Sequence, residues 1–296
     1  MKELIDDISA RLLARYPEDE ARSLAWWIAE EMTGLTRTQL LFGDKGTAFF
    51  SHLQEKLPEI IARLLNFEPI QYIFGHTIWS GLDLKVTPAT LIPRPETAEL
   101  VQRINALTAN NLFPFRRTKG VSLLDIGTGS GCIAIALKKA HPEWRVTGID
   151  ISPEAIEVAK ENACRNNAKV EFQIADIFSD ENGVIEPLGG EEIEHFGTFD
   201  IVVSNPPYIC ESEKTSMRPN VLDFEPESAL FVPDEDPLLF YRRIANLHLG
   251  KYLFFEINEA FAPEMKDLLE SEGYTDIQIT NDIYGKPRII EGRMVK

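Results

Sequence analysis

The chain has 296 residues, 44% hydrophobic and 26% charged, which is typical of soluble globular proteins and long enough for two domains. Its net charge of −17, from 30 basic and 47 acidic residues, argues against direct nucleic-acid binding, because phosphate contacts require a basic surface. The three cysteines lie far apart without a CxxC pair, so we expect a reducing compartment, no disulfide and no metal site.

Nothing in the sequence points to a membrane or to export. We find no run near the roughly 18 apolar residues that a membrane span needs. The N-terminal stretch Met1–Asp7 is acidic, and it has neither the apolar core of a signal peptide nor the character of an arginine-rich transit peptide. We therefore expect a cytoplasmic monomer that does not contact membranes.

Residues 1–67 have the pattern of amphipathic helices. Apolar residues recur at helical spacing in three stripes, at 4–13, 24–32 and 49–65. Pro17 breaks the first stripe, Gly34 ends the second, and Pro58 is expected to interrupt the third. Tryptophan and phenylalanine at this spacing are more often core than binding site. The pattern predicts a small helical bundle, and we interpret it as a docking domain.

Residues 68–112 are interpreted as a connector between two domains. Short alternating runs broken by glycines predict a β-hairpin within 71–86. The two prolines of 91–97 keep the next stretch extended, and Pro95 is well placed to start the helix that follows.

Residues 113–296 alternate between strands and helices. Strands are expected near 121–127, 145–150, 170–176, 199–205 and 251–257, with an antiparallel pair near 277–283 and 288–294. Helices are expected near 132–140, 153–166, 237–247 and 261–272. This alternation predicts an α/β fold with a mostly parallel sheet covered on both faces. The acidic stretch 179–198 is interpreted as a solvated loop.

A glycine loop follows the first of these strands and precedes a helix. Its residues are Gly127, Thr128, Gly129, Ser130 and Gly131. Such a loop lets a ligand approach the backbone closely and meet free N–H groups. The dinucleotide fingerprint needs glycine or alanine at the next position, and Cys132 there argues against a nicotinamide dehydrogenase. The pattern DxGxGxG, beginning at Asp125, instead resembles the S-adenosyl-L-methionine (AdoMet) loop of Rossmann-like methyltransferases.

Two acids end the next two strands. Asp150 is placed to accept hydrogen bonds from ribose hydroxyls; the alternative is the N-cap of the following helix, for which Ser152 is at least as good a candidate. Asp176 could accept a hydrogen bond from an adenine amino group while Ile177 and Phe178 pack against the ring. For Asp176 the alternative is a simple turn residue.

A polar tetrapeptide follows the expected strand near 199–205, at the edge where open α/β sheets bind ligands. Asn205 offers a carbonyl acceptor, Pro206 and Pro207 leave rigid backbone carbonyls free, and Tyr208 adds a flat ring. The set suits gripping a planar NH2 group so that its nitrogen can attack. The alternative is a strand-to-loop exit in which Asn205 is a turn residue.

Four stretches together resemble the HemK/PrmC family of protein-glutamine methyltransferases, namely Pro69–Ile73, Leu91–Thr97, Asp125–Gly131 and Asn205–Ile209. Segments 224–230 and 287–293 fit as well. The tetrapeptide alone is shared with DNA adenine methyltransferases, whereas Ile-Pro-Arg-Pro-Glu-Thr is more specific. The resemblance implies a class I, Rossmann-like AdoMet-dependent methyltransferase sheet with a small N-terminal helical bundle. It also implies that the substrate is the glutamine of the Gly-Gly-Gln motif in peptide chain release factors.

By this resemblance the glycine loop and Asp150 hold the cofactor, and the tetrapeptide holds the glutamine. The expected cofactor contacts are Gly127, Thr128, Gly129, Ser130, Gly131, Asp150, Asp176, Ile177 and Asn205. The expected catalytic and substrate contacts are Asn205, Pro206, Pro207 and Tyr208, with Arg94 and Glu96 supporting the pocket near the domain junction. The alternative for Arg94 and Glu96 is an interdomain salt bridge.

The sequence departs from the family pattern in three places. Ile177 stands where tryptophan is frequent, Asn258 stands where glycine is usual, and the acidic stretch 179–198 is an insertion. Two other functions compete with glutamine methylation. A nucleic-acid adenine methyltransferase would use the same grip on an exocyclic amine, and a non-enzymatic scaffold would keep only the fold.

Overall fold

The computed structural model describes residues 1–42, 48–109, 120–179 and 198–294, and it leaves the side chains of 48–54 undescribed. The chain divides into two compact units, one of Met1–Gly75 with Arg218–Phe224 and one of His76–Met217 with Glu225–Lys296. The acidic stretch that was predicted to be a solvated loop lies almost entirely outside the described residues.

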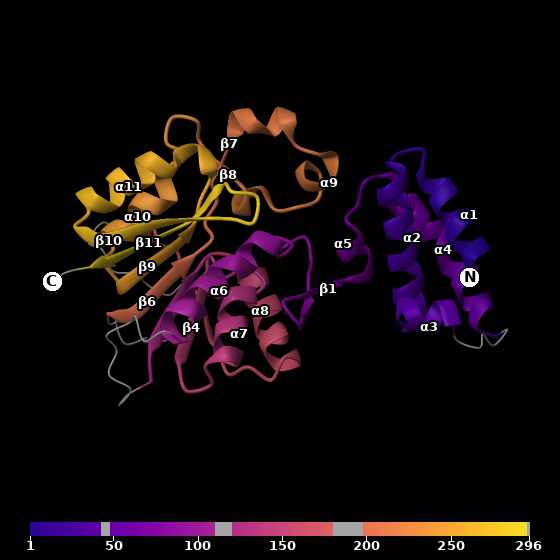
Figure 1. The fold of residues 1–296 in the computed structure, drawn as a ribbon, viewed down its shortest axis with the longest axis horizontal. Helices are drawn as coiled ribbons and strands as arrows, with labels where there is room; N and C mark the ends of the chain where they lie inside the picture. The colour runs from indigo at the N-terminus through magenta and orange to yellow at the C-terminus, as the bar shows by residue number, and fades with distance from the viewer. Residues whose placement is uncertain (43–47, 110–119, 180–197, 295–296) are drawn as a thin grey trace. The chain divides into compact units, whose positions relative to one another are not determined.

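The first unit is a bundle of helices around one apolar core. Its N-terminal helices are α1 (Lys2–Leu12), α2 (Glu18–Thr33), α3 (Arg37–Phe42), α4 (Ala48–Leu65) and α5 (Ile70–Phe74) (Figure 1). The predicted end of the second helix is confirmed, because Gly34 adopts φ 64° and its N–H donates to the carbonyl of Glu30. Trp27, the tryptophan of the predicted stripe, is partly buried against this core, and its neighbour Trp26 is buried within it.

The expected interruption at Pro58 is wrong, because α4 continues through it. A proline inside a helix removes one backbone hydrogen bond. Here the residues around it, Leu57, Ile60 and Ile61, are buried in the core of the unit. Packing of this apolar face stabilises the helix enough to offset the lost bond.

The second unit is built on a seven-stranded sheet of order β10-β11-β9-β6-β3-β4-β5. The strands are β3 (Ser122–Ile126), β4 (Arg145–Asp150), β5 (Glu171–Ile174), β6 (Phe199–Ser204), β9 (Gly250–Glu256), β10 (Tyr274–Asn281) and β11 (Pro287–Met294). The first five pair in parallel, and β10 and β11 add an antiparallel edge. The predicted parallel sheet with its antiparallel pair is therefore confirmed.

Helices cover both faces of this sheet, and Figure 1 shows them around it. They are α6 (Pro95–Ala109), α7 (Cys132–Ala140), α8 (Pro153–Arg165), α10 (Leu239–Asn246) and α11 (Ala262–Ser271). Successive residues of a strand point to opposite faces of the sheet and so belong to different apolar clusters. Leu123 packs with α6 and α7, whereas Leu124 packs with α10 and α11. The predicted start of α6 at Pro95 is confirmed.

The predicted hairpin is β1 (His76–Trp79) and β2 (Leu82–Lys85), paired antiparallel. Its Trp79 and Leu84 are buried in the core cluster that α6 and α7 share, so the hairpin is part of the second unit. The residues just before it form helix α5 and not strand.

The connection between β6 and α10 contains short elements that the sequence pattern did not indicate. They are β7 (Ile209–Cys210), β8 (Phe231–Val232), helix α9 (Pro219–Leu222) and two 3-10 helices, Glu211–Ser216 and Glu227–Ala229. A third 3-10 helix, Glu259–Phe261, precedes α11. The strands β7 and β8 pair in parallel as a separate small sheet.

Candidate active site

The glycine loop joins the end of β3 to the start of α7. Gly127, Gly129 and Gly131 have φ of 69°, 54° and 80°, a region that L side chains rarely adopt. A Cβ at Gly131 would also lie 3.1 Å from Ile135 Cδ1 and 3.2 Å from Ala159 Cβ. Glycine is therefore required here by conformation and by close packing.

The side chain of Asp125, in β3, holds the glycine loop by hydrogen bonds. It is fully buried, and its Oδ2 accepts hydrogen bonds from the Thr128 hydroxyl at 2.7 Å and from the Ala134 N–H at 3.3 Å. Its Oδ1 has no hydrogen-bond partner among the described residues. Burial raises the pKa of this carboxyl to about 7. Asp125 thus shapes the loop and does not line the cavity above it.

Asp150 ends β4 and holds the loop from the side. Its Oδ2 accepts the Gly129 N–H at 2.8 Å, and its Oδ1 accepts the Ser152 N–H at 3.0 Å. The N-cap of α8 is Ser152, whose Oγ accepts the Ala155 N–H, so the capping alternative for Asp150 is wrong. Burial raises the pKa of Asp150, and a carboxylate retains further lone pairs for ligand hydroxyls.

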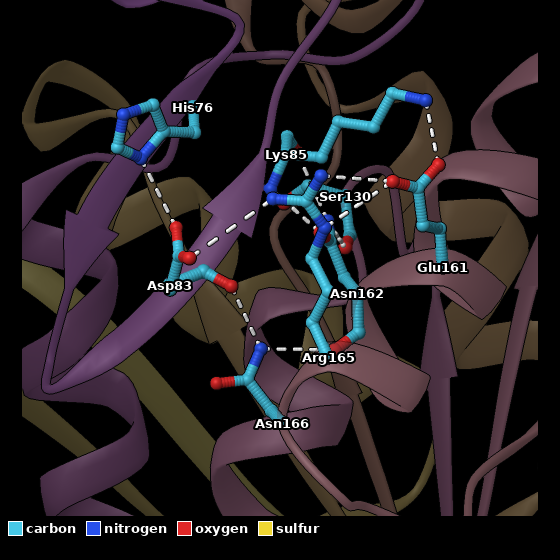
Figure 2. A network of polar contacts seen from close by, with 8 residues as sticks. All are labelled: His76, Asp83, Lys85, Ser130, Glu161, Asn162, Arg165 and Asn166. Carbon is cyan, nitrogen blue, oxygen red and sulfur yellow. Dashed lines mark hydrogen bonds and ion pairs between the residues drawn. The ribbon is translucent and has the colours of Figure 1, made fainter.

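The glycine loop is also anchored from behind by a buried amide, shown in Figure 2. Asn162 of α8 is fully buried; its Nδ2 donates to the carbonyls of Ser130 and Lys85, and its Oδ1 accepts the Lys85 N–H. Asn166 extends this network to the carbonyl of Asp83 in the hairpin. The hairpin, α8 and the glycine loop are therefore joined by hydrogen bonds in one polar network.

A cavity of about 410 Å³ opens above the loop. The predicted site residues that line it are Arg94, Gly127, Thr128, Gly129, Ser130, Asp150, Asp176, Ile177, Asn205, Pro206 and Pro207. Gly131, Tyr208 and Glu96 do not line it. The structure thus gathers the carboxyl ends of β3, β4 and β6 around one cavity, as expected at this edge of an open α/β sheet.

One end of the cavity is apolar and aromatic. Ile177 is buried there, and Phe178 is half-exposed and packs edge-on against Phe240 at 5.5 Å between ring centroids. Asp176 accepts the Phe178 N–H with its Oδ1 at 2.8 Å, so it does act as a turn residue while also lining the cavity. Phe240 on α10 was not anticipated, because no local pattern distinguishes it from core.

The tetrapeptide begins directly after β6. The Ser204 hydroxyl donates to the Ile126 carbonyl at 2.7 Å and fixes the end of the strand beside the glycine loop. Asn205 is partly buried, and its Nδ2 donates to the Thr97 hydroxyl at 3.2 Å. Tyr208 is turned away from the cavity; it packs against the apolar cluster of α10 and α11, and its hydroxyl donates to Glu256 at 3.1 Å. Burial raises the Tyr208 pKa.

Asn258, where the family usually has glycine, adds a tie to this loop. Its Nδ2 donates to the Tyr208 carbonyl and to Glu213, each at 3.2 Å. Its Oδ1 accepts the Ala260 N–H as the N-cap of the third 3-10 helix. The departure therefore holds the backbone of the tetrapeptide in place.

Arg94 forms an ion pair with Glu225 at 2.7 Å, and both residues belong to the second unit. The alternative of an interdomain salt bridge is therefore wrong for Arg94. The Glu225 side chain is fully buried and also accepts the Ile92 N–H at 3.2 Å, and a buried carboxylate needs such partners. The ion pair fixes the Ile-Pro-Arg-Pro segment beside the cavity.

Among the described residues, no group of three or more His, Cys, Asp or Glu side chains could hold a metal ion. No helix within the described ranges is long and apolar enough to cross a membrane.

Residues 117–280 match the methyltransferase domain family, and residues 3–75 match the PrmC N-terminal domain. The release factor glutamine methyltransferase of Bacteroides thetaiotaomicron is 44% identical over 280 residues, which cover 93% of each chain. The chain belongs to the release factor glutamine methyltransferase family. The enzyme of that name from Flavobacterium psychrophilum is 39% identical over 286 residues, covering 95% of this chain and 94% of the other.

The fold is also that of known methyltransferase structures. The catalytic domain of hMettl16, solved with a MAT2A 3'UTR hairpin, superposes with a TM-score of 0.53 at 16% identity, covering 73% of this chain and 77% of that one. At this identity the similarity concerns the fold alone. The predicted class I architecture is thereby confirmed.

Proposed function

We propose that this protein transfers a methyl group from AdoMet to the side-chain amide nitrogen of the glutamine in the Gly-Gly-Gln motif of peptide chain release factors. We further propose that it acts as a cytoplasmic monomer without contacting nucleic acid. The names of its relatives support the reaction. The observation that carries the proposal is that Asn205 lines the same cavity as the glycine loop and Asp150.

The residues around this cavity fit AdoMet. Asp150 is a carboxylate with spare lone pairs for ribose hydroxyls, and the backbone of Gly127–Ser130 lies along the wall. The apolar end at Ile177 and Phe178 has the flat, hydrophobic character that an adenine ring requires, with Asp176 beside it. When bound, AdoMet supplies an electrophilic methyl group on a sulfonium sulfur.

An amide nitrogen is a weak nucleophile because its lone pair is delocalised, so the protein must work mainly by positioning. In our mechanism the Oδ1 of Asn205 and the backbone carbonyl of Pro206 accept the two hydrogens of the glutamine NH2 group. Tyr208 does not touch the bound amide; its hydroxyl bond to Glu256 holds the backbone of the tetrapeptide that carries these acceptors. Orientation of this kind can contribute several kcal/mol toward the barrier. Once methylated, the nitrogen carries the positive charge that left the sulfonium, and this protonated N-methyl amide is strongly acidic, so it loses one proton to solvent.

Replacing Asn205 tests this mechanism. Asn205→Ala should reduce methyl transfer to a release factor by at least about a hundredfold, while AdoMet affinity measured by calorimetry stays within roughly threefold. The matched control is Asn246→Ala, which removes an exposed amide at the end of α10 and should leave both values unchanged. Retained turnover in Asn205→Ala would overturn the proposed role.

A further inference from the structure

A chain of hydrogen bonds runs behind the tetrapeptide. The Nδ2 of Asn205 donates to the Thr97 hydroxyl at 3.2 Å, and that hydroxyl donates to Oε2 of Glu256 at 2.8 Å. The other carboxylate oxygen, Oε1, accepts the Tyr208 hydroxyl at 3.1 Å. One carboxylate therefore meets both ends of the tetrapeptide, one of them through Thr97.

The fold brings these groups together from distant parts of the sequence. Strands β6 and β9 are parallel neighbours, with Ser204 opposite Phe255. Asn205, directly after β6, and Glu256, the last residue of β9, therefore lie side by side. Thr97 comes from the first turn of α6 and is buried. Thr97 is more than a hundred residues from both Asn205 and Glu256 in sequence, so only the fold brings these groups together.

The number of protons that each group can donate fixes the direction of these hydrogen bonds. An ionised carboxylate can only accept hydrogen bonds, and a threonine hydroxyl has one proton to donate. Because Thr97 donates to Glu256, it can offer only a lone pair to Asn205. The amide of Asn205 must then present its NH2 group to Thr97, which leaves its carbonyl oxygen for other partners. A neutral residue at position 256 would not impose this direction.

We propose that Glu256 is a positioning residue that, through Thr97, fixes the amide orientation of Asn205 and directly anchors Tyr208. This inference rests on the proposed function, since an outward carbonyl oxygen is what a glutamine NH2 group needs. Glu256 touches no substrate itself, and it is absent from the cavity lining.

The surroundings of Glu256 show that a charge there is costly. The residue is 1% exposed, and burial raises its pKa. The hydrogen bonds from Thr97 and Tyr208 lower that pKa, as does the charge of Arg288, whereas Glu96 raises it. The groups that face Glu256 are Thr97 and Glu96 of α6, Cys132 of α7, Tyr208 after β6, Tyr241 of α10 and Arg288 of β11. A carboxylate serving only to fill space would be poorly suited to this position.

A purely structural role would predict that these residues hold α6 against the sheet and nothing more. The two roles differ in what they change. Structural damage lowers the free energy of unfolding. Loss of the fixed hydrogen-bond direction instead lets the side-chain amide of Asn205 flip, which lowers kcat. The variants Glu256→Gln, Thr97→Val and Thr97→Ser separate these outcomes. The control is Glu291→Gln; Glu291 is a buried carboxylate of β11 that pairs with Arg103 of α6.

With a release factor as substrate, Glu256→Gln and Thr97→Val should each lower kcat by about ten- to a hundredfold, with AdoMet affinity unchanged. Thr97→Ser keeps the hydroxyl and should restore kcat to within roughly threefold of the wild-type value. In the wild type kcat should fall on the acid side as Glu256 takes up a proton, and Glu256→Gln should lack this dependence. A kcat of Thr97→Val equal to that of Thr97→Ser would overturn the proposal.

A second measurement does not depend on the substrate. The side-chain NH2 resonances of Asn205, assigned by their loss in Asn205→Asp, should shift in Glu256→Gln and Thr97→Val but not in Glu291→Gln. Unchanged resonances in the first two variants would overturn the inference whatever the substrate is. If the wild type methylates no release factor while these shifts occur, the proposed function fails and the positioning role of Glu256 stands.

Discussion

The backbone N–H of Gly129 donates to Oδ2 of Asp150 over 2.8 Å. The acid at the end of β4 thereby holds the centre of the glycine loop that follows β3. Its second oxygen accepts the Ser152 N–H at the start of α8. Asp150 consequently connects two elements that a cofactor would contact, in addition to offering lone pairs to a ribose.

The first prediction separates these two roles of Asp150. Asp150→Asn keeps one acceptor oxygen and should bind AdoMet about tenfold more weakly, because one charge-assisted acceptor is lost. Asp150→Ala also releases Gly129 and should weaken binding by about a hundredfold or more. Calorimetric titration with AdoMet measures both. Equal affinities for the two variants would mean that the bond to Gly129 contributes nothing.

The second prediction concerns the buried amide behind the loop. Asn162→Ala should lower the free energy of unfolding by about 2–4 kcal/mol, because it leaves the buried carbonyl of Ser130 and the partly buried N–H and carbonyl of Lys85 without these partners. Urea denaturation measures this change. Asp83→Ala is the control; that side chain is exposed and should contribute less than about 1 kcal/mol. Comparable losses in the two variants would contradict this account.

The third prediction follows from the pKa of Asp125, which burial raises from the ordinary range of an aspartate to about 7. The buried carboxyl favours its protonated form, so its contribution to stability is complete below pH 4 and is lost as the pH rises through 7. The stability of the wild type relative to Asp125→Asn should therefore fall by roughly 2–4 kcal/mol between pH 4 and pH 8. A difference that does not change with pH would show that Asp125 titrates normally.

The fold of the second unit could be predicted well from the sequence. Apolar runs with β-branched residues gave each central strand to within a few residues, and Pro95 marked the start of α6. The predicted interruption at Pro58 was wrong because a local rule for proline ignores tertiary packing, which here stabilises α4. The short elements between β6 and α10 escaped notice because each is too short to show a period.

The site was predictable only where its residues follow one another in the chain. The glycine loop, Asp150 and Asn205 could each be identified from the sequence, because each lies at the end of a predicted strand, and all of them line the cavity. Glu225 and Glu256 did not, since their partners Arg94 and Thr97 are more than a hundred residues away in sequence. Buried polar pairs of this kind become visible only once the sheet has brought the segments together.

The central claim is tested most directly by where the methyl group goes. The protein should be incubated with methyl-labelled AdoMet and a release factor, with a release factor in which the Gly-Gly-Gln glutamine is replaced, and with DNA. We predict label on the intact release factor alone, located by tandem mass spectrometry on the side-chain nitrogen of that glutamine. Label on DNA, or equal label on the substituted release factor, would contradict the account.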